Sequence, residues 1–440
     1  MRINNFSADG IEFYASNYNA IANSSSNGSG VYGLYIPSNS LNNVVADSNL
    51  TESGNYDARF GLDSVAVCSN TLSNLLGSGY RPIFYYSGAS SGSASGQDSS
   101  EILICNSTGV SISDSSVHGS DTYSNNGVQI YYSKNIAFSN VNSTFNRVGY
   151  DVTSSSGVTV SGASVPYTVS NAPGYAINGA FIVNRTNNSA FSAVSVYSNF
   201  TGTSCDTGGA SFYFEQARNN SVSGYDLAAR GVDTCGAWPS TGRAFDFYLI
   251  NSPNITIANG TGTAYAGGSS SCYAIQKIYD YGIYASSSPN LAVYNSTFSN
   301  MSATGCVASY PYSVVGIYLA SGSDNSTITG SAVLASQQNG LVLQSSGNTL
   351  DGFATANNGN SGIVLSSSSG NLINNTISSN NSPSGIEFVS NSLNNAVLNS
   401  AFSENAVYDV NLLVTNINKC SNQISNTTGS GGRAIVYLSG

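Results

Sequence analysis

Charged residues are concentrated between positions 215 and 280 of this 440-residue chain, and three of them are aspartates that could act on a sugar. Glycoside hydrolysis needs two carboxyl groups about 5–10 Å apart, one acting as an acid and the other as a base or nucleophile. Asp246 together with Asp280 or Asp233 could supply that pair. The same charges would also suit a structural role, in which they pair with one another to anchor long loops. The full set is Glu215, Arg218, Asp226, Arg230, Asp233, Arg243, Asp246, Lys277 and Asp280.

Tyrosines recur in the same region at one position of a repeated phrase, where a variable residue lies between two apolar ones. In four successive phrases this position holds Tyr213, Asp246, Tyr284 and Tyr318. In a strand the variable residue points away from the buried face, so these four are expected to form an outward-facing row. Tyrosine has an apolar ring and a polar hydroxyl, which suits sugar binding, and a carboxylate accepts sugar hydroxyls. The row therefore predicts a glycan-binding face, although tyrosine also suits any exposed strand surface.

The phrase is clearest between residues 316 and 410. It begins at Gly316, Gly340, Gly362 and Gly385, with a weaker copy at Val407, so successive copies lie 22–24 residues apart. Apolar residues at its first and third positions alternate as in a half-buried strand, and no stretch keeps a helical period. A period in the twenties indicates one coil of a solenoid. Earlier copies are marked by Gly10, Gly33, Ser64, Glu101, Gly127, Gly149, Ala180, Ser211, Ala244 and Gly282.

These repeats predict an all-β fold, a right-handed parallel β-helix with three short strands in each of about 15 coils. Residues 1–440 are expected to form one domain. Its N-terminal coils occupy residues 1–155, coils with long loops occupy 156–310, and regular coils occupy 311–440. A leucine-rich repeat would need its Leu-x-x-Leu-x-Leu signature, and a β-sandwich rarely repeats so regularly.

The Gly-Ile-x-Leu…Asn-x-Ile…Asn/Gly-Ser/Thr phrase resembles the parallel β-helix repeat of the pectate-lyase-like superfamily, over most of the chain. In character the chain is most similar to archaeal and bacterial surface proteins with such repeats. The resemblance implies the fold, but the superfamily includes polysaccharide-degrading enzymes, phage tailspikes and surface proteins, so it implies no single activity. Polygalacturonase-like members carry paired aspartates, a Gly-His-Gly and an Arg-x-Lys. This chain has no Asp-Asp and no Arg-x-Lys, and its one histidine reads Val117-His-Gly119, so an inherited pectinase site is not expected.

The seven cysteines predict disulfides and hence an oxidising compartment. Cys68 and Cys105 are expected to occupy the same position of successive coils, within disulfide reach. Four others fall one to each long loop, most simply paired as Cys205–Cys235 and Cys272–Cys306. Cys420 is then the free thiol. The alternative is a set of buried thiols in a reducing compartment. With no Cys-x-x-Cys and a single His118, neither a metal site nor a cofactor is expected.

Overall composition excludes two classes of partner. The net charge is −10, the pI is near 4.3 and there are only three lysines, Lys134, Lys277 and Lys419, which argues against nucleic acid. The chain contains no run of about 20 apolar residues, so no membrane span is expected.

The start of the chain lacks the apolar core of a signal peptide, so a leader has been removed or this is a piece of a larger surface protein. Candidate glycosylation sites are Asn23, Asn106, Asn142, Asn254, Asn295 and Asn325.

The sequence therefore predicts an extracellular cell-surface β-helix protein with a structural, adhesive or glycan-binding role and no catalytic activity. Its expected partners are a polysaccharide, a cell-surface glycan or other surface-protein subunits. The alternative is a glycoside hydrolase or polysaccharide lyase that uses the loop-walled face of residues 156–310. A third hypothesis is a metal-handling periplasmic protein, because some copper-associated proteins share this repeat; two methionines and one histidine argue against it.

Overall fold

The chain divides into two compact units. We call Met1–Phe200 with Ser211–Tyr213 the N-terminal unit, and Thr201–Ala210 with Phe214–Gly440 the C-terminal unit. The computed structural model describes residues 2–5, 7–122, 125–166, 178–202, 206–233, 240–267, 276–304, 312–413 and 421–437. Much of the long loop sequence expected between residues 156 and 310 lies outside these ranges.

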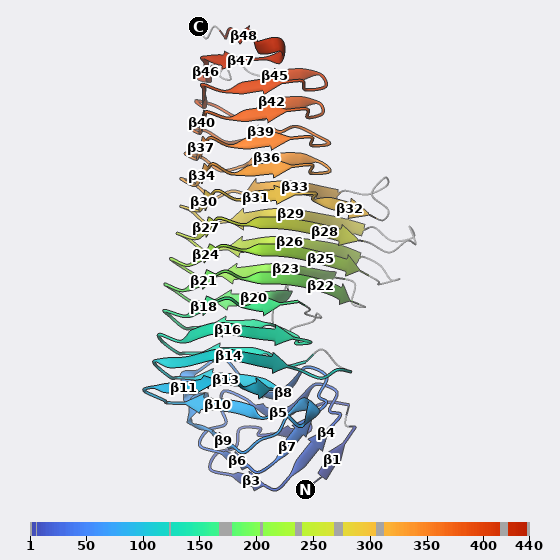
Figure 1. Cartoon of the computed structure of the whole chain (residues 1–440), viewed down its shortest axis with the longest axis vertical. Helices are drawn as coiled ribbons and strands as arrows, with labels where there is room; N and C mark the ends of the chain where they lie inside the picture. Colours follow the sequence, from blue (N-terminus) through green and yellow to red (C-terminus); the bar gives the residue numbers. More distant parts are fainter. Residues whose placement is uncertain are drawn as a thin grey trace. The chain divides into compact units, whose positions relative to one another are not determined.

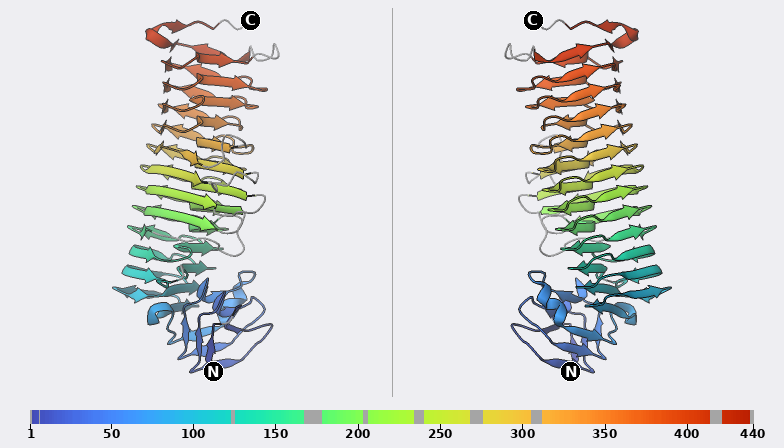
Figure 2. Two further views of the ribbon diagram at one scale, coloured as in Figure 1. Left: turned by 90° about the vertical axis from the view of Figure 1, so that its right-hand side faces the viewer. Right: turned by 90° about the vertical axis from the view of Figure 1, so that its left-hand side faces the viewer.

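The C-terminal unit is built from coils whose strands stack into three sheets, as Figures 1 and 2 show, and the printed strand pairs are parallel except β47 with β48, which is antiparallel. The first sheet contains β26 (Ser240–Ile250), β29 (Gln276–Ser286), β33 (Tyr312–Leu319), β36 (Asn339–Leu343), β39 (Ile363–Ser366), β42 (Ser384–Val389) and β45 (Tyr408–Leu412). The second contains β24 (Ser221–Ser223), β27 (Thr256–Ala258), β30 (Ala292–Tyr294), β34 (Thr327–Thr329), β37 (Thr349–Asp351), β40 (Leu372–Asn374), β43 (Ala396–Leu398) and β46 (Gln423–Ser425). The third contains β25 (Asp226–Asp233), β28 (Thr261–Gly267), β31 (Thr297–Ser299), β32 (Ser302–Thr304), β35 (Ala332–Leu334), β38 (Ala354–Ala356), β41 (Ile377–Ser379), β44 (Ala401–Ser403), β47 (Thr427–Thr428) and β48 (Ala434–Ile435).

The repeated phrase sets the register of the first sheet. Its first apolar residues lie opposite one another from coil to coil, in the order Ile317, Leu341, Ile363, Ile386 and Val410. The preceding glycine lies at a crowded inward corner, where a Cβ atom on Gly316 would lie 2.1 Å from Val333. The all-β fold and the parallel stacking are thus confirmed. The last copy of the phrase begins at Asp409 rather than Val407, because Ile386 pairs with Val410.

Buried asparagines form ladders along the turns between the sheets. The side-chain amide of Asn348 donates to Oδ1 of Asn371 at 2.9 Å, Asn371 donates to Asn395 at 2.9 Å, and Asn395 donates to Asn422 at 3.1 Å. Each Oδ1 also accepts the backbone N–H of the residue below it in the ladder. These bonds satisfy turn groups that coil stacking removes from water. The chain is rich in Asn and Ser for this reason rather than because it is disordered.

The N-terminal unit has two parts. Its first part is a set of three small parallel sheets. They contain β1 (Arg2–Asn4), β4 (Ser25–Asn27) and β7 (Asn49–Thr51); β2 (Ile11–Glu12), β5 (Tyr32–Ile36) and β8 (Tyr56–Phe60); and β3 (Ala20–Ala22), β6 (Val44–Ala46) and β9 (Thr71–Ser73). Its second part consists of coils, and their first sheet contains β10 (Ile83–Ser87), β13 (Glu101–Cys105), β15 (Val128–Tyr131), β17 (Tyr150–Thr153) and β20 (Asn178–Asn184). The second sheet contains β11 (Gly92–Ser95), β12 (Asp98–Ser99), β14 (Val110–His118), β16 (Ala137–Thr144), β18 (Thr159–Ser161) and β21 (Ala190–Ser192). The third contains β19 (Ser164–Val165) and β22 (Ser195–Gly202). The strand β23 (Asp206–Glu215) contributes residues to both units.

The marker expected at Ser64 is wrong. Residues Val65–Ser69 form the 3-10 helix η1, and the coil strand is β8. Among the described residues, two further short helices are η2 (Ser78–Tyr80) and η4 (Ser430–Gly432). In the parts of the chain that the structure describes, none of the helices has the length and apolar character needed to cross a membrane.

Cys68 and Cys105 form a disulfide with their Cα atoms 5.4 Å apart. The two cysteines do not come together as expected from equal positions in successive coils, because Cys68 lies in η1 while Cys105 of β13 lies opposite Ser87 of β10. The bond therefore joins a helical turn to a neighbouring sheet rather than two strands in register. The other cysteines, Cys205, Cys235, Cys272, Cys306 and Cys420, lie outside the described residues.

Candidate functional site

Asp246 does not lie on the outer face. In β26, Phe247 lies opposite Ile283 and Tyr248 lies opposite Tyr284, so Asp246 takes the inward corner and Tyr248 takes the variable position. Its side chain is fully buried, and a Cβ atom on Gly262 would lie 2.4 Å from its Oδ2 atom. The marker at Ala244 was therefore placed two residues early. Apolar residues at 245, 247 and 249 allow either register, so the sequence alone could not distinguish them.

The predicted catalytic aspartates do not meet on an accessible surface. Asp280 is also fully buried, and its Oδ2 atom accepts the backbone N–H of Ser302 at 2.7 Å. Burial raises the pKa of both Asp246 and Asp280 well above the ordinary value, and the proximity of Asp280 raises the pKa of Asp246 further. Burial therefore favours the neutral form of both carboxyl groups inside the coil. The side chain of Asp233 lies outside the described residues.

Three tyrosines form the outward-facing row of the C-terminal unit. The rings of Tyr248 and Tyr284 are 5.1 Å apart with planes 14° from parallel, and those of Tyr284 and Tyr318 are 5.5 Å apart at 7°. All three side chains are half-buried. Of the four residues predicted for the row, the structure thus brings Tyr284 and Tyr318 together. Tyr213 belongs to the N-terminal unit and is only 4% exposed.

A second row of aromatic rings lies beside the tyrosine row and comes from the same strands, β26 and β29. Phe245 and Tyr281 stack at 5.5 Å and 14°. Their planes are tilted against the tyrosine row, by 61° between Phe245 and Tyr284 and by 49° between Tyr281 and Tyr284. The two rows form the walls of a hollow of about 370 Å³, which we call the aromatic groove. It is lined by Arg243, Phe245, Tyr248, Tyr279, Tyr281, Tyr284 and Tyr318.

The aromatic groove offers apolar walls and hydroxyl groups. Because the rings of each row stack on one another, their faces are largely covered, and edges and hydroxyls remain for a ligand. The hydroxyl of Tyr318 donates to Oε1 of Gln344 at 2.6 Å. Burial raises the pKa of Tyr248, Tyr284 and Tyr318, so these hydroxyls stay protonated and can donate at neutral pH.

Sequence reasoning missed the second row because it aligned only one position of each phrase. Phe245 and Tyr281 lie opposite each other in β26 and β29, as do Arg243 and Tyr279 two residues earlier. The Tyr279-Asp-Tyr281 alternation ahead of Gly282 was the feature of the sequence that could have revealed the second row.

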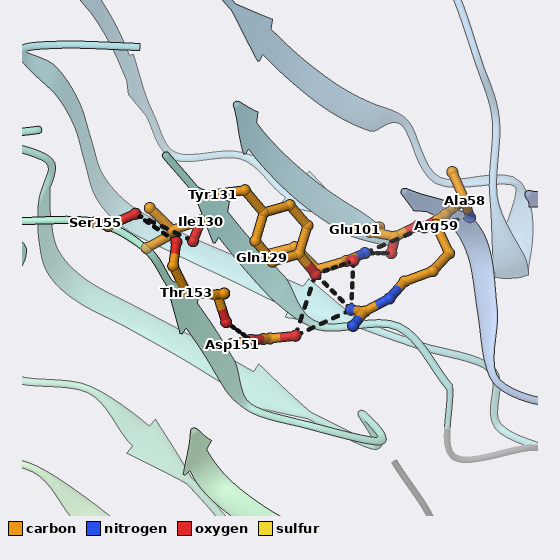
Figure 3. Close-up of polar contacts among 9 residues, drawn as sticks. All are labelled: Ala58, Arg59, Glu101, Gln129, Ile130, Tyr131, Asp151, Thr153 and Ser155. Atoms are coloured by element: carbon orange, nitrogen blue, oxygen red, sulfur yellow. Dashed lines mark hydrogen bonds and ion pairs between the residues drawn. The ribbon is translucent and has the colours of Figure 1, made fainter. Parts of the chain in front are cut away.

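A second cluster of polar side chains lies in the N-terminal unit and centres on Arg59 (Figure 3). Arg59 belongs to β8, and its Nη1 atom donates to Oε1 of Gln129 at 2.8 Å, to Oδ2 of Asp151 at 3.0 Å and to the hydroxyl oxygen of Tyr131. Thr153 in turn donates to the other oxygen of Asp151 at 2.9 Å. These bonds connect the small N-terminal sheets to strands β15 and β17.

Two buried acids reinforce the same contact. Oε2 of Glu101 accepts the backbone N–H of Ala58 at 3.0 Å, and Gln129 donates its amide to the other oxygen of Glu101. Asp57 accepts the side-chain amide of Asn126 at 2.7 Å. Burial raises the pKa of Asp57 to about 6, and burial together with nearby Asp57 raises the pKa of Glu101. The contact between the two parts is therefore polar and includes buried carboxyl groups.

A hollow of about 410 Å³ opens beside this cluster. Residues far apart in the sequence meet there, from the ends of β5 and β8 on one side and of β17 and β20 on the other. We call it the arginine pocket. It is lined by Tyr32, Tyr35, Arg59, Phe60, Gly61, Leu62, Asp63, Thr153, Asn184 and Arg185. No single sequence motif could reveal it, because each half lies in a different part of the fold.

The candidate glycosylation sites share an exposed position. All six asparagines are exposed, and most adopt a left-handed turn conformation. Some of these asparagines hydrogen-bond to another asparagine on the surface; the side-chain amide of Asn254, for example, donates to Oδ1 of Asn219 at 2.8 Å. Attachment of a glycan at these positions stays a prediction. The sites are Asn23, Asn106, Asn142, Asn254, Asn295 and Asn325.

Comparison with known proteins finds solved structures that are similar to this chain at low identity. No curated protein matches the sequence. A periplasmic alginate epimerase, AlgG in a double-mutant form, is similar at 11% identity and a TM-score of 0.44, over 94% of this chain and 79% of the epimerase. The surface adhesin PfbA of Streptococcus pneumoniae is similar at 10% identity and a TM-score of 0.30, over 76% of this chain and 84% of the adhesin. A tailspike protein of an E. coli bacteriophage, in complex with a pentasaccharide, is similar at 12% identity and a TM-score of 0.34, over 79% of this chain and 72% of the tailspike.

At such identities and TM-scores these similarities carry no argument about what this chain binds. The family comparison is more direct, because it reports on the repeats themselves. The family model described as "Right handed beta helix region" matches residues 315–439, which include strands β34 to β48. Together with the parallel three-sheet coils, this match identifies residues 315–439 as a right-handed β-helix region, the type of repeat that the sequence resembles.

Proposed function

We propose that this protein is a non-catalytic, extracellular β-helix protein that binds a glycan in the aromatic groove of its C-terminal unit. The observation that carries the proposal is the pair of aromatic rows tilted against each other by 49–61°. The stacked rows leave ring edges and hydroxyls uncovered, so sugar rings can pack against the apolar edges while the tyrosine hydroxyls meet the sugar hydroxyls.

The rigidity of the groove supports binding. Its walls are side chains of neighbouring strands in a parallel sheet, and Phe245 and Tyr281 are at most 5% exposed. Side chains that are held in place before the ligand arrives lose little conformational entropy on binding. A groove along the stacking direction also suits an extended polymer better than a small metabolite.

The charge of the groove argues against catalysis. Arg243 is the only charged residue among the described lining residues. The carboxyl groups of Asp246 and Asp280 lie inside the coil, where burial raises their pKa values. Hydrolysis needs two carboxyl groups on either side of the glycosidic bond, and the described groove does not provide them. The alternative, a glycoside hydrolase or polysaccharide lyase, is for this reason the weaker proposal.

The disulfide between Cys68 and Cys105 supports an oxidising location. We propose on that ground a location outside the cytoplasm, at the cell surface or in the secreted fraction. Its partners would be a polysaccharide, a cell-surface glycan or further surface subunits.

Affinity electrophoresis against a panel of soluble polysaccharides tests the proposal, together with assays for reducing ends and unsaturated products. Wild type should be retarded by at least one polysaccharide without releasing product. The Tyr248→Ala variant should lose the retardation, whereas Tyr294→Ala, which removes an exposed tyrosine from β30 in a different sheet, should keep it. Product release that is abolished in Asp246→Asn would overturn the non-catalytic assignment.

A further inference from the structure

The last residues of the chain repeat its first residues at a constant spacing. Residues 33–88, which we call the first segment, align without a gap with residues 385–440, the second segment, and nearly half of the aligned residues are identical. Each residue of the second segment lies 352 positions after its counterpart, as Gly385 lies after Gly33. The identities extend beyond the Ser, Asn and Gly that are common throughout the chain. They include Glu52 with Glu404, Tyr56 with Tyr408, Asp57 with Asp409, Cys68 with Cys420, and Arg81 with Arg433.

Over the residues that the structure describes, the two segments also fold alike. Strands β6 and β43, strands β8 and β45, and helices η2 and η4 begin and end at counterpart residues of the alignment. Ser78 donates its backbone N–H to Oδ2 of Asp57 at 2.5 Å, and Ser430 makes the same bond to Asp409 at 2.6 Å. In both segments the chain then leaves the turn through an antiparallel contact between the same two positions. The second segment is therefore a structural repeat of the first.

The first segment joins the small N-terminal sheets to the coils that follow it. Its strand β8 is the end strand of a small sheet, and coil residues bond to the backbone of that strand. Asp57 donates its backbone N–H to Oδ1 of Asn126 at 2.7 Å, and Ala58 donates to Oε2 of Glu101 at 3.0 Å. Tyr56 of the same strand is only 1% exposed. The coils of residues 83–153 thus cover the end strand of the first segment.

The second segment exposes the surface that the first one buries. Among the described strands, β45 is the end strand of its sheet, as β8 is of its own. Tyr408 is 52% exposed, whereas its counterpart Tyr56 is 1% exposed. Val407 beside it is 59% exposed, and Val436, which follows the turn, is 79% exposed. Apolar side chains at the open end of a sheet form a surface suited to packing against further strands.

We propose that residues 407–412 and 430–436 form a docking surface for a further set of β-helix coils, built like those of residues 83–153. The occupant belongs to the same polypeptide, because in the first segment the turn η2 leads directly into β10, the first strand of those coils. The turn η4 directs the chain through the same antiparallel contact. The second segment is thus the joint to a following β-helix unit, a role that does not depend on glycan binding.

A second molecule of this chain suits the surface less well. Its coil residues Glu101 and Asn126 already bond to Ala58 and Asp57 of its own first segment, and its Cys105 is already in a disulfide. These contacts would have to open before the coils could dock on another molecule.

Cys420 gives the joint a chemical marker. It has the place of Cys68 in the repeat, and Cys68 forms a disulfide with Cys105 of the coils that follow. Docked coils with a cysteine at the place of Cys105 should therefore bond to Cys420.

A chain that carries a second copy of residues 89–440 directly after Gly440 tests the proposal. In the added copy, Cys420→Ser removes the second marker thiol. Disulfide mapping of the monomeric, non-reduced protein should find the remaining Cys420 linked to a Cys105 peptide, alongside the Cys68–Cys105 link. The 440-residue chain should show the Cys68–Cys105 link and leave Cys420 open to alkylation. An extended chain that folds with Cys420 still open to alkylation would overturn the proposal.

Two substitutions in the original part of the extended chain test the surface itself. Tyr408→Lys should lower the linked fraction of Cys420 at least fivefold, because its counterpart Tyr56 is buried. Ile377→Lys changes another apolar residue, 55% exposed in β41 of a different sheet, and should leave that fraction unchanged. Equal linkage in both variants would show that the tether alone brings the cysteines together, which contradicts docking. Dimerisation of the 440-residue chain that Tyr408→Lys abolishes would assign the surface to a second molecule and also overturn the proposal.

A graft within the 440-residue chain keeps the proposal testable if the extended chain does not fold. Residues 408–433 replace residues 56–81, which preserves every spacing, and Asn411→Arg restores the arginine of β8. If the second segment can dock these coils, the grafted Cys420 should form the disulfide with Cys105. A graft in which Cys105 stays reactive to alkylation would overturn the proposal.

Discussion

Acidic residues occupy inward corners of the coils where most repeats have glycine. Asp57 lies opposite Gly33, Glu101 opposite Gly127 and Asp246 opposite Gly282, since the residues on either side of each are paired in that register. Other glycines leave the space that admits two of these carboxyl groups, because a Cβ atom on Gly77 would lie 2.6 Å from Oδ2 of Asp57 and one on Gly262 would lie 2.4 Å from Oδ2 of Asp246. Burial raises the pKa of Asp57, Glu101 and Asp246, so each is favoured in its neutral form in the folded protein.

These raised pKa values predict that stability falls as the pH rises. In the unfolded chain Asp246 loses its proton near the ordinary pKa of 3.8, whereas the folded chain retains it to a much higher pH. Over that interval the unfolded state binds fewer protons, so each such carboxyl costs about 1.4 kcal/mol of unfolding free energy per pH unit. The variant Asp246→Asn, which has no proton to lose, should lose less stability than wild type between pH 4.5 and 7.5 in urea unfolding. An equal or steeper loss in the variant would show that Asp246 is ionised in the fold.

The Cys68–Cys105 disulfide closes a loop with a sequence separation of 37 residues. For a loop of this length the chain-entropy model gives about 3–4 kcal/mol of stabilisation. The double variant Cys68→Ser/Cys105→Ser should therefore unfold at a lower temperature than wild type in calorimetry. Addition of a reductant should lower the melting temperature of wild type and leave that of the double variant nearly unchanged. If both respond equally, another disulfide carries the effect.

The strands and turns of this fold are held by contacts that repeat from coil to coil, and the sequence was most informative about the register of these repeats. The Gly-apolar-x-apolar phrase gave the register of β33, β36, β39 and β42 because a glycine at a crowded corner has no substitute without a shift of its neighbours. The phrase failed at Ala244 and Val407, where apolar alternation allows two registers and the corner is occupied by an acid instead of glycine. It also failed at Ser64, which precedes η1, because the coil strand β8 has Asp57 at its corner. The aromatic groove and the arginine pocket arise from contacts across coils, which periodicity within one strand cannot reveal.

The asparagine ladder predicts that one interior asparagine supports several turns. Asn371→Leu removes the acceptor for the backbone and side-chain N–H groups of Asn348 and the donor to Asn395. Buried N–H groups left without partners should cost roughly 2–4 kcal/mol in urea unfolding. The same substitution at exposed Asn360 should change the unfolding free energy by less than about 0.5 kcal/mol. Equal effects at the two positions would show that the ladder contributes nothing specific.

At the scale of the whole molecule, the thiol count tests the assigned compartment. The expected pairs Cys205–Cys235 and Cys272–Cys306 stay predictions alongside the Cys68–Cys105 bond. If they form, alkylation of the denatured protein without reductant should modify one thiol, at Cys420. Intact mass spectrometry before and after alkylation measures this number. Alkylation of all seven cysteines would place the protein in a reducing compartment and remove a main support for the surface role.

Isothermal titration of the polysaccharide that most retards the wild-type protein tests the central claim most directly, namely that the aromatic groove binds a glycan. Tyr284 is the middle ring of the tyrosine row and also contacts Tyr281 of the second row. Its truncation in Tyr284→Ala should raise the Kd at least tenfold, about 1.4 kcal/mol, while Tyr294→Ala should bind as wild type does. A folded Tyr284→Ala that binds with an unchanged Kd would contradict the account.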